Sequence, residues 1–252
     1  MALQEELEKQ GNWLFRYRSF LPLIILLIGT VLYLRTELYP ETFFLEETPY
    51  EIYYERVCLF ICLFGLIIRI YTIGHTPTNT SGRNTKEQVA DSVNSSGIYS
   101  IVRHPLYLGN FFMWLGCAMM TGNFWFIVAF ILAYWIYYER IMFAEEQFLR
   151  KKFDAVYLDW ANKTPAFIPS FNFRKFIKPK YSFSWKKVLK KEKNGLAAIF
   201  LIFTFFDITG ELVEQQTKFD YLLIALCIAT GFLYLTLKYL KKYTNVLNES
   251  GR

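Results

Sequence analysis

Six long apolar runs limit most strongly how this chain of 252 residues can fold. A helix needs roughly 20 apolar residues to cross a bilayer, and it satisfies its own backbone hydrogen bonds there. One pair of such runs could be a buried hairpin of a soluble protein, but six could not. The runs cover residues 20–34, 53–73, 107–120, 124–138, 196–213 and 221–240. The sequence therefore predicts an all-α, polytopic integral membrane protein with about six transmembrane helices and a cytoplasmic cap.

The distribution of charge predicts the orientation of these helices. Basic residues precede the first run, recur at 83–103 and 150–193, and end the last run, whereas the loops around 37–51 and 211–220 are acidic. The positive-inside rule then places both termini and the basic loops in the cytoplasm, at a bacterial inner membrane or the endoplasmic reticulum. This topology, together with the attraction of basic residues to anionic headgroups, explains the net charge of +6. Nucleic acid is not an expected partner, because the basic residues flank the apolar runs.

Three segments follow along the chain. Residues 1–74 supply two anchoring helices, residues 75–170 hold nearly all the unusual polar residues, and residues 171–252 add a basic connector and a C-terminal transmembrane hairpin. The loop 75–100 is rich in Gly, Pro, Ser, Thr and Asn, so much of it cannot be regular helix. We expect a folded cap instead of a loose linker, because the loop leads directly into the most polar motif. Cys58 and Cys62 share a helix face, but no histidine or acidic residue accompanies them in the pattern as a further metal ligand, so no metal site is predicted.

That motif is Arg103-His104-Pro105, at the start of an apolar run, and Glu145-Glu146 follows about one membrane hairpin later. Each part has an ordinary explanation: an arginine reaching headgroups, an interfacial histidine, or acids at the start of a helix. Charged residues beside hydrocarbon are nevertheless costly and are usually kept for function. Because only residues 121–123 separate the two runs, both polar groups should lie close together at one membrane face. The combination at this spacing favours a functional site.

The residues around these two motifs resemble a known family. Residues 97–109, Gly-Ile-Tyr-Ser-Ile-Val-Arg-His-Pro-Leu-Tyr-Leu-Gly, resemble the first signature of the isoprenylcysteine carboxyl methyltransferase and phospholipid methyltransferase superfamily. Glu145-Glu146, Phe153, Tyr157 and Pro165 resemble its second signature, and the resemblance covers about residues 70–170. It implies that S-adenosylmethionine is bound between the hairpin and the cytoplasmic loop. The cofactor contacts that it implies are Val93, Asn94, Tyr99, Arg103, His104, Pro105, Leu106, Tyr107, Gly109, Glu145 and Glu146.

The chain departs from the family pattern at three positions. Asp154 stands where the family often has glycine, and Trp160 stands where it often has tyrosine. The prenylcysteine branch carries a substrate arginine one helical turn before the carboxylate pair, and Ile141 occupies that position here. Arg140 is one residue away, which is about 100° around a helix. A prenylcysteine substrate is therefore less expected, whereas the cofactor assignment is unaffected.

The expected chemistry needs no protein nucleophile. A carboxylate or phosphate acceptor is already ionised near neutral pH, and the chain has only two histidines. We therefore assign no catalytic residue, because proximity and orientation alone can supply roughly 7–11 kcal/mol. The acceptor should be lipidic, since the site is expected at the membrane surface. The basic residues that could hold its acidic headgroup are Arg69, Arg83, Lys86 and Arg140, although ordinary positive-inside charge explains them equally well.

Other functions stay open at this point. N-methylation of an aminophospholipid is the nearest alternative to O-methylation, and Glu146 could then accept the proton from the amine. A membrane sterol-type reductase shares a related pattern, but Leu106 stands where such enzymes typically have asparagine. A non-catalytic scaffold or transporter would spread polar residues through several spans at mid-depth. The aromatic residues Tyr134, Trp135, Tyr137 and Tyr138 are expected to form an interfacial belt and not a cofactor pocket.

Overall fold

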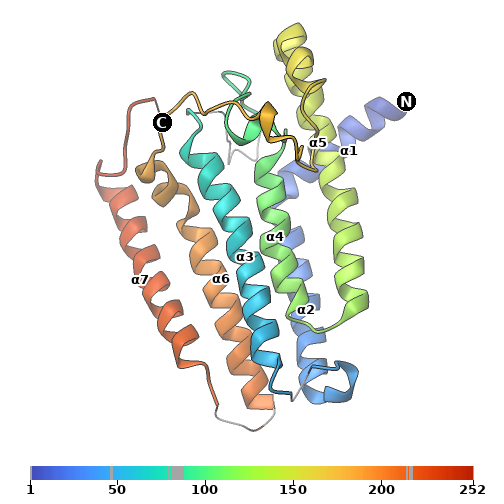
Figure 1. Ribbon diagram of the computed structural model, residues 1–252, viewed down its shortest axis with the longest axis vertical. Coiled ribbons are helices and arrows are strands. Elements are labelled where there is room, and N and C mark those ends of the chain that lie inside the picture. The colour runs from blue at the N-terminus through green and yellow to red at the C-terminus, as the bar shows by residue number, and fades with distance from the viewer. Residues whose placement is uncertain are drawn as a thin grey trace.

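The computed structural model describes residues 2–45, 48–78, 80, 88–213, 215 and 218–251. Its α-helices are α1 (Leu3–Tyr17), α2 (Leu21–Leu38), α3 (Glu51–Gly74), α4 (Pro105–Met119), α5 (Phe124–Ala161), α6 (Trp185–Val213) and α7 (Tyr221–Tyr243). Short 3-10 helices occur at Pro40–Thr42, Ile98–Ser100 and Phe173–Lys175. Apart from an isolated bridge between Gly97 and Ile177, this part of the chain contains no β-structure. The predicted all-α fold is confirmed, and Figure 1 shows α2 to α7 aligned side by side.

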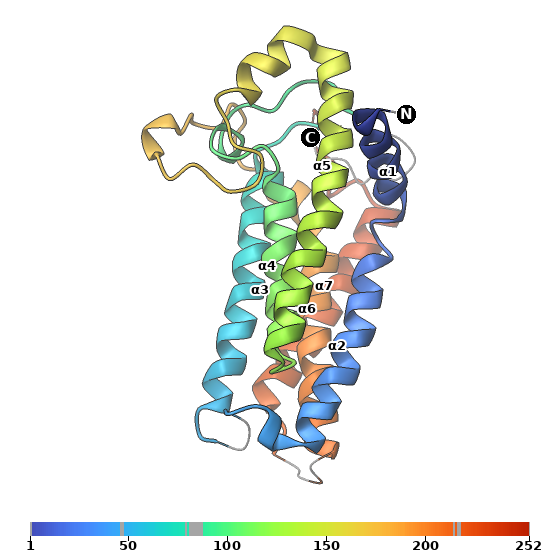
Figure 2. The same ribbon diagram turned by 90° about the vertical axis from the view of Figure 1, so that its right-hand side faces the viewer.

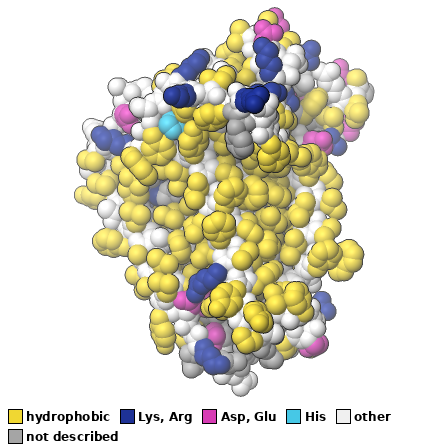
Figure 3. Space-filling view, in the orientation of Figure 1, with side chains coloured by type: hydrophobic (Ala, Val, Ile, Leu, Met, Phe, Trp, Pro, Cys, Tyr) yellow, Lys and Arg dark blue, Asp and Glu magenta, His cyan; other side chains and the backbone are white. Residues whose placement is uncertain are grey.

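The protein is an integral membrane protein. Figure 3 shows a continuous band of hydrophobic side chains over the middle of the bundle, with charged side chains gathered at its two ends. Among the described helices, α3, α5, α6 and α7 are each long and apolar enough to cross a membrane. Helix α1 and residues 22–38 of α2 form a fifth candidate, bent by 69°. The predicted number of six spans is not confirmed, because α4 has 15 residues, or about 22 Å, against the roughly 30 Å of a bilayer core.

Helices α3 and α4 approach each other closely through small residues. A Cβ atom at Gly65 would lie 2.4 Å from the backbone oxygen of Gly109, and one at Gly116 would lie 2.4 Å from the backbone oxygen of Cys58. Small residues of this kind let the backbones of membrane helices come together. The Cys62 thiol adds a hydrogen bond to the Met113 oxygen at 2.9 Å. The start of α4, which carries the polar motif, is thereby fixed against α3.

Both chain ends, the described parts of the loop 75–104 and the end of α5 lie at the same end of the bundle (Figures 1 and 2). Helix α5 extends beyond its neighbours there, and its last turns fold back over the bundle after a break at Asp154, where φ is +42°. The described part of the loop is held by α6, since the Lys187 ammonium donates to the backbone oxygens of Thr76 and Pro77 at 2.6 and 2.9 Å. Which side of the membrane this end faces remains a prediction.

Candidate active site

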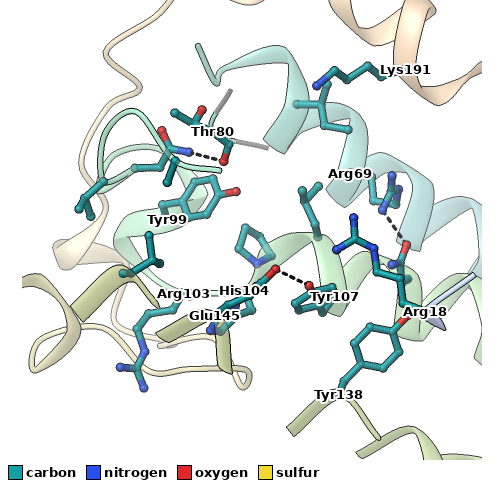
Figure 4. Close-up of a pocket in the computed structure, with 18 of the residues that line it drawn as sticks. Arg18, Arg69, Thr80, Tyr99, Arg103, His104, Tyr107, Tyr138, Glu145 and Lys191 are labelled. Carbon is teal, nitrogen blue, oxygen red and sulfur yellow. Dashed lines mark hydrogen bonds and ion pairs between the residues drawn. The ribbon is translucent and has the colours of Figure 1, made fainter. Parts of the chain in front are cut away.

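A cavity of about 350 Å³ lies at this end of the bundle, lined mainly by α4, α5 and the described loop residues between 80 and 104. Figure 4 shows its lining side chains coming from separate parts of the chain. Most of the predicted cofactor residues line it, namely Val93, Asn94, Tyr99, Arg103, His104, Pro105, Leu106, Tyr107 and Glu145. Gly109 and Glu146 are not in the lining. The structure therefore brings the two sequence motifs together around one cavity.

The turn at His104-Pro105 is fixed by the segment that follows α5. Pro105 occupies the first turn of α4, where its missing N–H leaves no intrahelical bond unmade. The backbone N–H groups of Arg103 and His104 donate to the oxygens of Pro165 and Ala166, at 2.8 and 3.1 Å. The Trp160 indole N–H donates to the backbone oxygen of Tyr99 at 2.9 Å. Pro165 belongs to the second signature, so the two signatures hold each other in place through the backbone.

The two neighbouring glutamates differ in their hydrogen bonds, although both lie near His104, whose Nδ1 atom is 3.7 Å from Glu145 Oε2. Glu145 lines the cavity and accepts a hydrogen bond from the Tyr107 hydroxyl at 2.7 Å. Glu146 turns to the first motif instead: its Oε1 atom lies 2.9 Å from His104 Nε2, and its Oε2 atom lies 3.2 Å from Arg103 Nη1. Figure 4 shows the Arg103 guanidinium directed away from Tyr99 and Tyr107. Glu145 is thus available to a ligand, whereas Glu146 orients the motif.

Aromatic rings form much of the cavity wall. Tyr107 lies over His104 with ring centroids 5.8 Å apart and meets Tyr138 at 4.8 Å. The Tyr134 hydroxyl donates to the backbone oxygen of Tyr107 at 2.7 Å. Burial, followed by the negative charge of Glu145, raises the pKa of the Tyr99 phenol above its ordinary value. Tyr99 therefore stays neutral and can donate a hydrogen bond.

The prediction that four aromatic residues of α5 form an interfacial belt is wrong for two of them. Tyr134 and Tyr138 are only 2% and 4% exposed, and Tyr138 lines the cavity. The physical reason is helical spacing: residues 134, 138 and 145 recur at intervals of four and seven, so they share the face of α5 that meets α4. Counting back from Glu145 along that face would have identified both tyrosines as buried residues that face α4.

The predicted substrate residues are spread over different environments. Arg69 lines the cavity, but its guanidinium donates to both carboxylate oxygens of Glu192 at 2.7 Å and to Asn110 Oδ1 at 2.6 Å. Gly109 makes room for this arginine, since a Cβ there would lie 2.6 Å from Arg69 Cγ. Arg140 does not line the cavity. Arg83 and Lys86 lie outside the described residues.

Several lining residues were not anticipated. They include Arg18, Ser19 and Pro22 at the α1–α2 junction, Asn110 and Trp114 on α4, and Lys191 on α6. Asn110 and Trp114 could have been found from their spacing to Tyr107 on one helix. The junction and Lys191 are distant in sequence, and only the tertiary packing brings them to the cavity. Within the described residues, no group of three or more His, Cys, Asp or Glu side chains is arranged to hold a metal ion.

Known proteins match the central part of this chain. Residues 55–156 match the family described as Phospholipid methyltransferase. The protein-S-isoprenylcysteine O-methyltransferase of Saccharomyces cerevisiae is 31% identical over 44% of this chain and 47% of its own length. The enzyme of the same name from Schizosaccharomyces pombe is 32% identical over 50% of this chain and 53% of its own length.

A relative with a different name covers a shorter stretch. The nickel-cobalt-cadmium resistance protein NccN of Alcaligenes xylosoxydans xylosoxydans is 35% identical over 35% of this chain and 39% of its own length. The chain spans about half the length of the two yeast relatives. No solved structure matches it significantly. The central part of the chain is therefore similar to phospholipid methyltransferases and to protein-S-isoprenylcysteine O-methyltransferases.

Proposed function

We propose that this protein is an S-adenosylmethionine-dependent membrane methyltransferase that methylates an oxygen of an acidic group, a carboxylate or a phosphate, on a lipidic acceptor. The observation that carries the proposal is the convergence of both family signatures on one cavity, with the Glu145 carboxylate directed into it. The relatives named as O-methyltransferases support the same reaction class. The charge distribution supports a cytoplasmic active site.

The lining fits the cofactor chemically. A volume of about 350 Å³ falls within the roughly 300–1,000 Å³ of ligand pockets. Glu145 can accept hydrogen bonds from the ammonium or the ribose hydroxyls, and the rings of Tyr99 and Tyr138 offer faces that attract a cation such as a sulfonium. When bound, the cofactor supplies an electrophilic methyl group.

The protein side chains then bind and orient the cofactor and the acceptor, and they exclude water from the site. Tyr107 fixes the rotamer of Glu145, and Glu146 fixes His104, so neither side chain must reorganise when a ligand arrives. The buried aromatic wall keeps water from the reacting atoms. The acceptor oxygen needs no general base because it is already ionised near neutral pH. Alignment of the acceptor with the methyl group is therefore the main contribution expected from the protein.

N-methylation is the second candidate, and one contact argues against it. A protonated amine must lose its proton before it can attack, and Glu146 was the expected proton acceptor. In the structure, Glu146 is held by His104 and Arg103 and does not line the cavity. The Glu145 carboxylate does line the cavity, but the proposal assigns it to the methyl donor. O-methylation, which requires no proton acceptor, therefore agrees better with this arrangement.

The chemical form of the product tests the proposal. The detergent-purified protein is incubated with S-adenosylmethionine labelled in the methyl group and with a total lipid extract. Mild alkali should release labelled methanol from a carboxyl methyl ester, whereas a methyl phosphodiester would keep its label under the same treatment and remain acidic. Label in a basic, alkali-stable lipid would favour N-methylation. Absence of both lipid labelling and cofactor binding would contradict the proposed activity.

A further inference from the structure

The connector between α5 and α6, residues 168–186, combines exposed apolar and exposed basic side chains, and its residues are not part of the described cavity lining. We infer that this connector docks on the surface of the membrane that holds the bundle and binds anionic lipid headgroups there. The inference goes beyond the proposed function and does not depend on it, since it concerns a contact of the protein with lipid and not the transfer of a methyl group.

Bulky apolar side chains of the connector are exposed at closely spaced positions. Phe171 is 81% exposed and Trp185 is 66% exposed. Ile168, Phe176 and Ile177 are also exposed. A cluster of such side chains at one surface is costly in water and typically marks a contact with a membrane or a protein. Phenylalanine and tryptophan side chains are favoured where headgroups meet acyl chains, so these residues suit the membrane interface.

Positive charge accompanies these apolar side chains. No acidic residue occurs between Asp159 and Glu192, so the charge of the connector is not compensated along the chain. The exposed basic residues of the connector are Arg174, Lys175, Lys178, Lys180 and Lys186. None of these five side chains forms an ion pair within the described part of the chain. Basic clusters beside an apolar surface attract anionic headgroups, so an anionic membrane surface matches both features of the connector.

The connector lies at the level where the bundle leaves the apolar layer. Figure 2 shows it, with the 3-10 helix Phe173–Lys175, extending sideways from the bundle near the ends of α3 and α4. Figure 3 shows Lys and Arg side chains at this end of the bundle, next to the band of hydrophobic side chains. A segment that extends sideways at this level passes over the lipids around the bundle. An acidic protein or a nucleic acid would match the positive charge, but it would leave the apolar side chains without a matching surface.

Backbone hydrogen bonds hold the connector against the first signature. The Gly97 N–H donates to the Ile177 oxygen at 2.8 Å, and the Ile177 N–H donates to the Ser100 hydroxyl at 3.0 Å. The Ser170 N–H donates to the Ile101 oxygen at 2.9 Å. These bonds pair backbone groups that would be costly to bring unpaired to the edge of the hydrocarbon layer. The connector can therefore present its side chains to lipid while this part of its backbone stays hydrogen-bonded.

Hydrogen–deuterium exchange of the full-length protein in nanodiscs tests the inference. The nanodiscs contain phosphatidylcholine alone or phosphatidylcholine with an equal amount of phosphatidylglycerol, which is anionic. The wild type is compared with Phe171→Ser, with a neutralised variant (Arg174→Gln, Lys175→Gln, Lys178→Gln) and with a charge-preserving variant (Arg174→Lys, Lys175→Arg, Lys178→Arg). The control variant neutralises three exposed lysines near the end of α7 (Lys238→Gln, Lys241→Gln, Lys242→Gln). The comparison of lipids on the wild type needs no substitution, so it decides the question even where a variant does not fold.

For the wild type we expect exchange in residues 168–186 to be at least about tenfold slower in the anionic nanodiscs, because each basic residue near an anionic surface strengthens binding about fivefold. The neutralised variant should lose this difference, whereas the charge-preserving variant and the α7 control should keep it. Phe171→Ser should exchange faster than the wild type in the anionic nanodiscs, because an apolar anchor is lost. A purely structural role of the connector would not make its exchange depend on the lipid.

Three results would overturn the inference. Equal exchange of the wild-type connector in both kinds of nanodisc would show that it does not bind anionic lipid, and the proposed function would stand. Loss of the lipid dependence in the α7 control as well would assign the effect to the overall charge and not to the connector. Slow exchange that requires two copies of the protein in one nanodisc, whatever the lipid, would assign this surface to a second copy of the chain.

Discussion

Glu145 and Glu146 are adjacent in the chain, but their side chains take different tasks because consecutive residues of a helix point about 100° apart. Glu145 faces the cavity and is held by Tyr107, whereas Glu146 faces the His104 turn. A ligand therefore meets one carboxylate, and the other stabilises the turn that shapes the cavity. The hydroxyl of Tyr107 is the contact that sets this division.

Removing that hydroxyl should weaken cofactor binding. Tyr107→Phe deletes the hydrogen bond to Glu145 at 2.7 Å and leaves the ring in place. A hydrogen bond to a charged group contributes about 1.5–3 kcal/mol, so we expect the Kd for S-adenosylhomocysteine to rise about tenfold or more. Calorimetry on the purified protein measures it. Tyr239→Phe, at an exposed position of α7, is the control and should bind normally; equal affinity in both variants would count against this contact.

Asp154 adopts a backbone conformation that favours glycine. Its φ of +42° and ψ of −119° break α5 where the chain folds back, and a side chain there costs about 1–3 kcal/mol. Asp154→Gly should therefore raise the unfolding temperature in detergent by roughly 2–4 °C for each kcal/mol gained. Asp159→Gly, in the helical turns after the break, should lower it. If both variants lose stability equally, the strain at Asp154 is not what the structure indicates.

At the scale of elements, the site depends on how closely α4 approaches α3. Gly65, Gly109 and Gly116 lie in the contact between the two helices, and Arg69 on α3 donates to Asn110 on α4 and to Glu192 on α6. Helix α4 is too short to be a typical membrane span, but this packing holds its first turn, with His104 and Tyr107, at the cavity. A change far along α4 should therefore affect the site through the tilt of the helix.

Gly116→Ala tests this close packing. The added methyl carbon would meet the backbone oxygen of Cys58 at 2.4 Å, and a backbone atom cannot move aside without shifting a helix. Overpacking of this kind typically costs about 1–3 kcal/mol, so the unfolding temperature should fall by several degrees. Gly231→Ala on α7, where no atom lies within 4 Å, should leave it unchanged or slightly higher. A stable Gly116→Ala variant would contradict the packing described here.

At the scale of the whole molecule, features that depend on local sequence could be predicted, whereas those that depend on tertiary packing could not. The apolar runs predicted α2, α3, α4 and α7 at nearly their observed places, since membrane helices are marked by composition. Helices α5 and α6 extend well beyond the runs at 124–138 and 196–213, and α1 was not predicted, because these polar turns carry no such signal. The two motifs could be expected to meet because a short turn joins α4 and α5. Arg18 and Lys191 could not be predicted as lining residues, because their position depends on how α1 and α6 pack. Tyr138 was misassigned because aromatic residues near a span end suggest an interface before they suggest a cavity.

The central claim is that a methyl donor binds in the cavity bounded by the His104-Pro105 turn and Glu145. Titration of the purified protein with S-adenosylhomocysteine, for the wild type and for Glu145→Ala and His104→Ala, tests it most directly. We predict binding by the wild type and an affinity at least about tenfold weaker in each variant, with folded protein retained in thermal unfolding, since each variant removes a part-buried polar contact at the cavity. Undiminished affinity in both variants, or no binding by the wild type, would contradict the account.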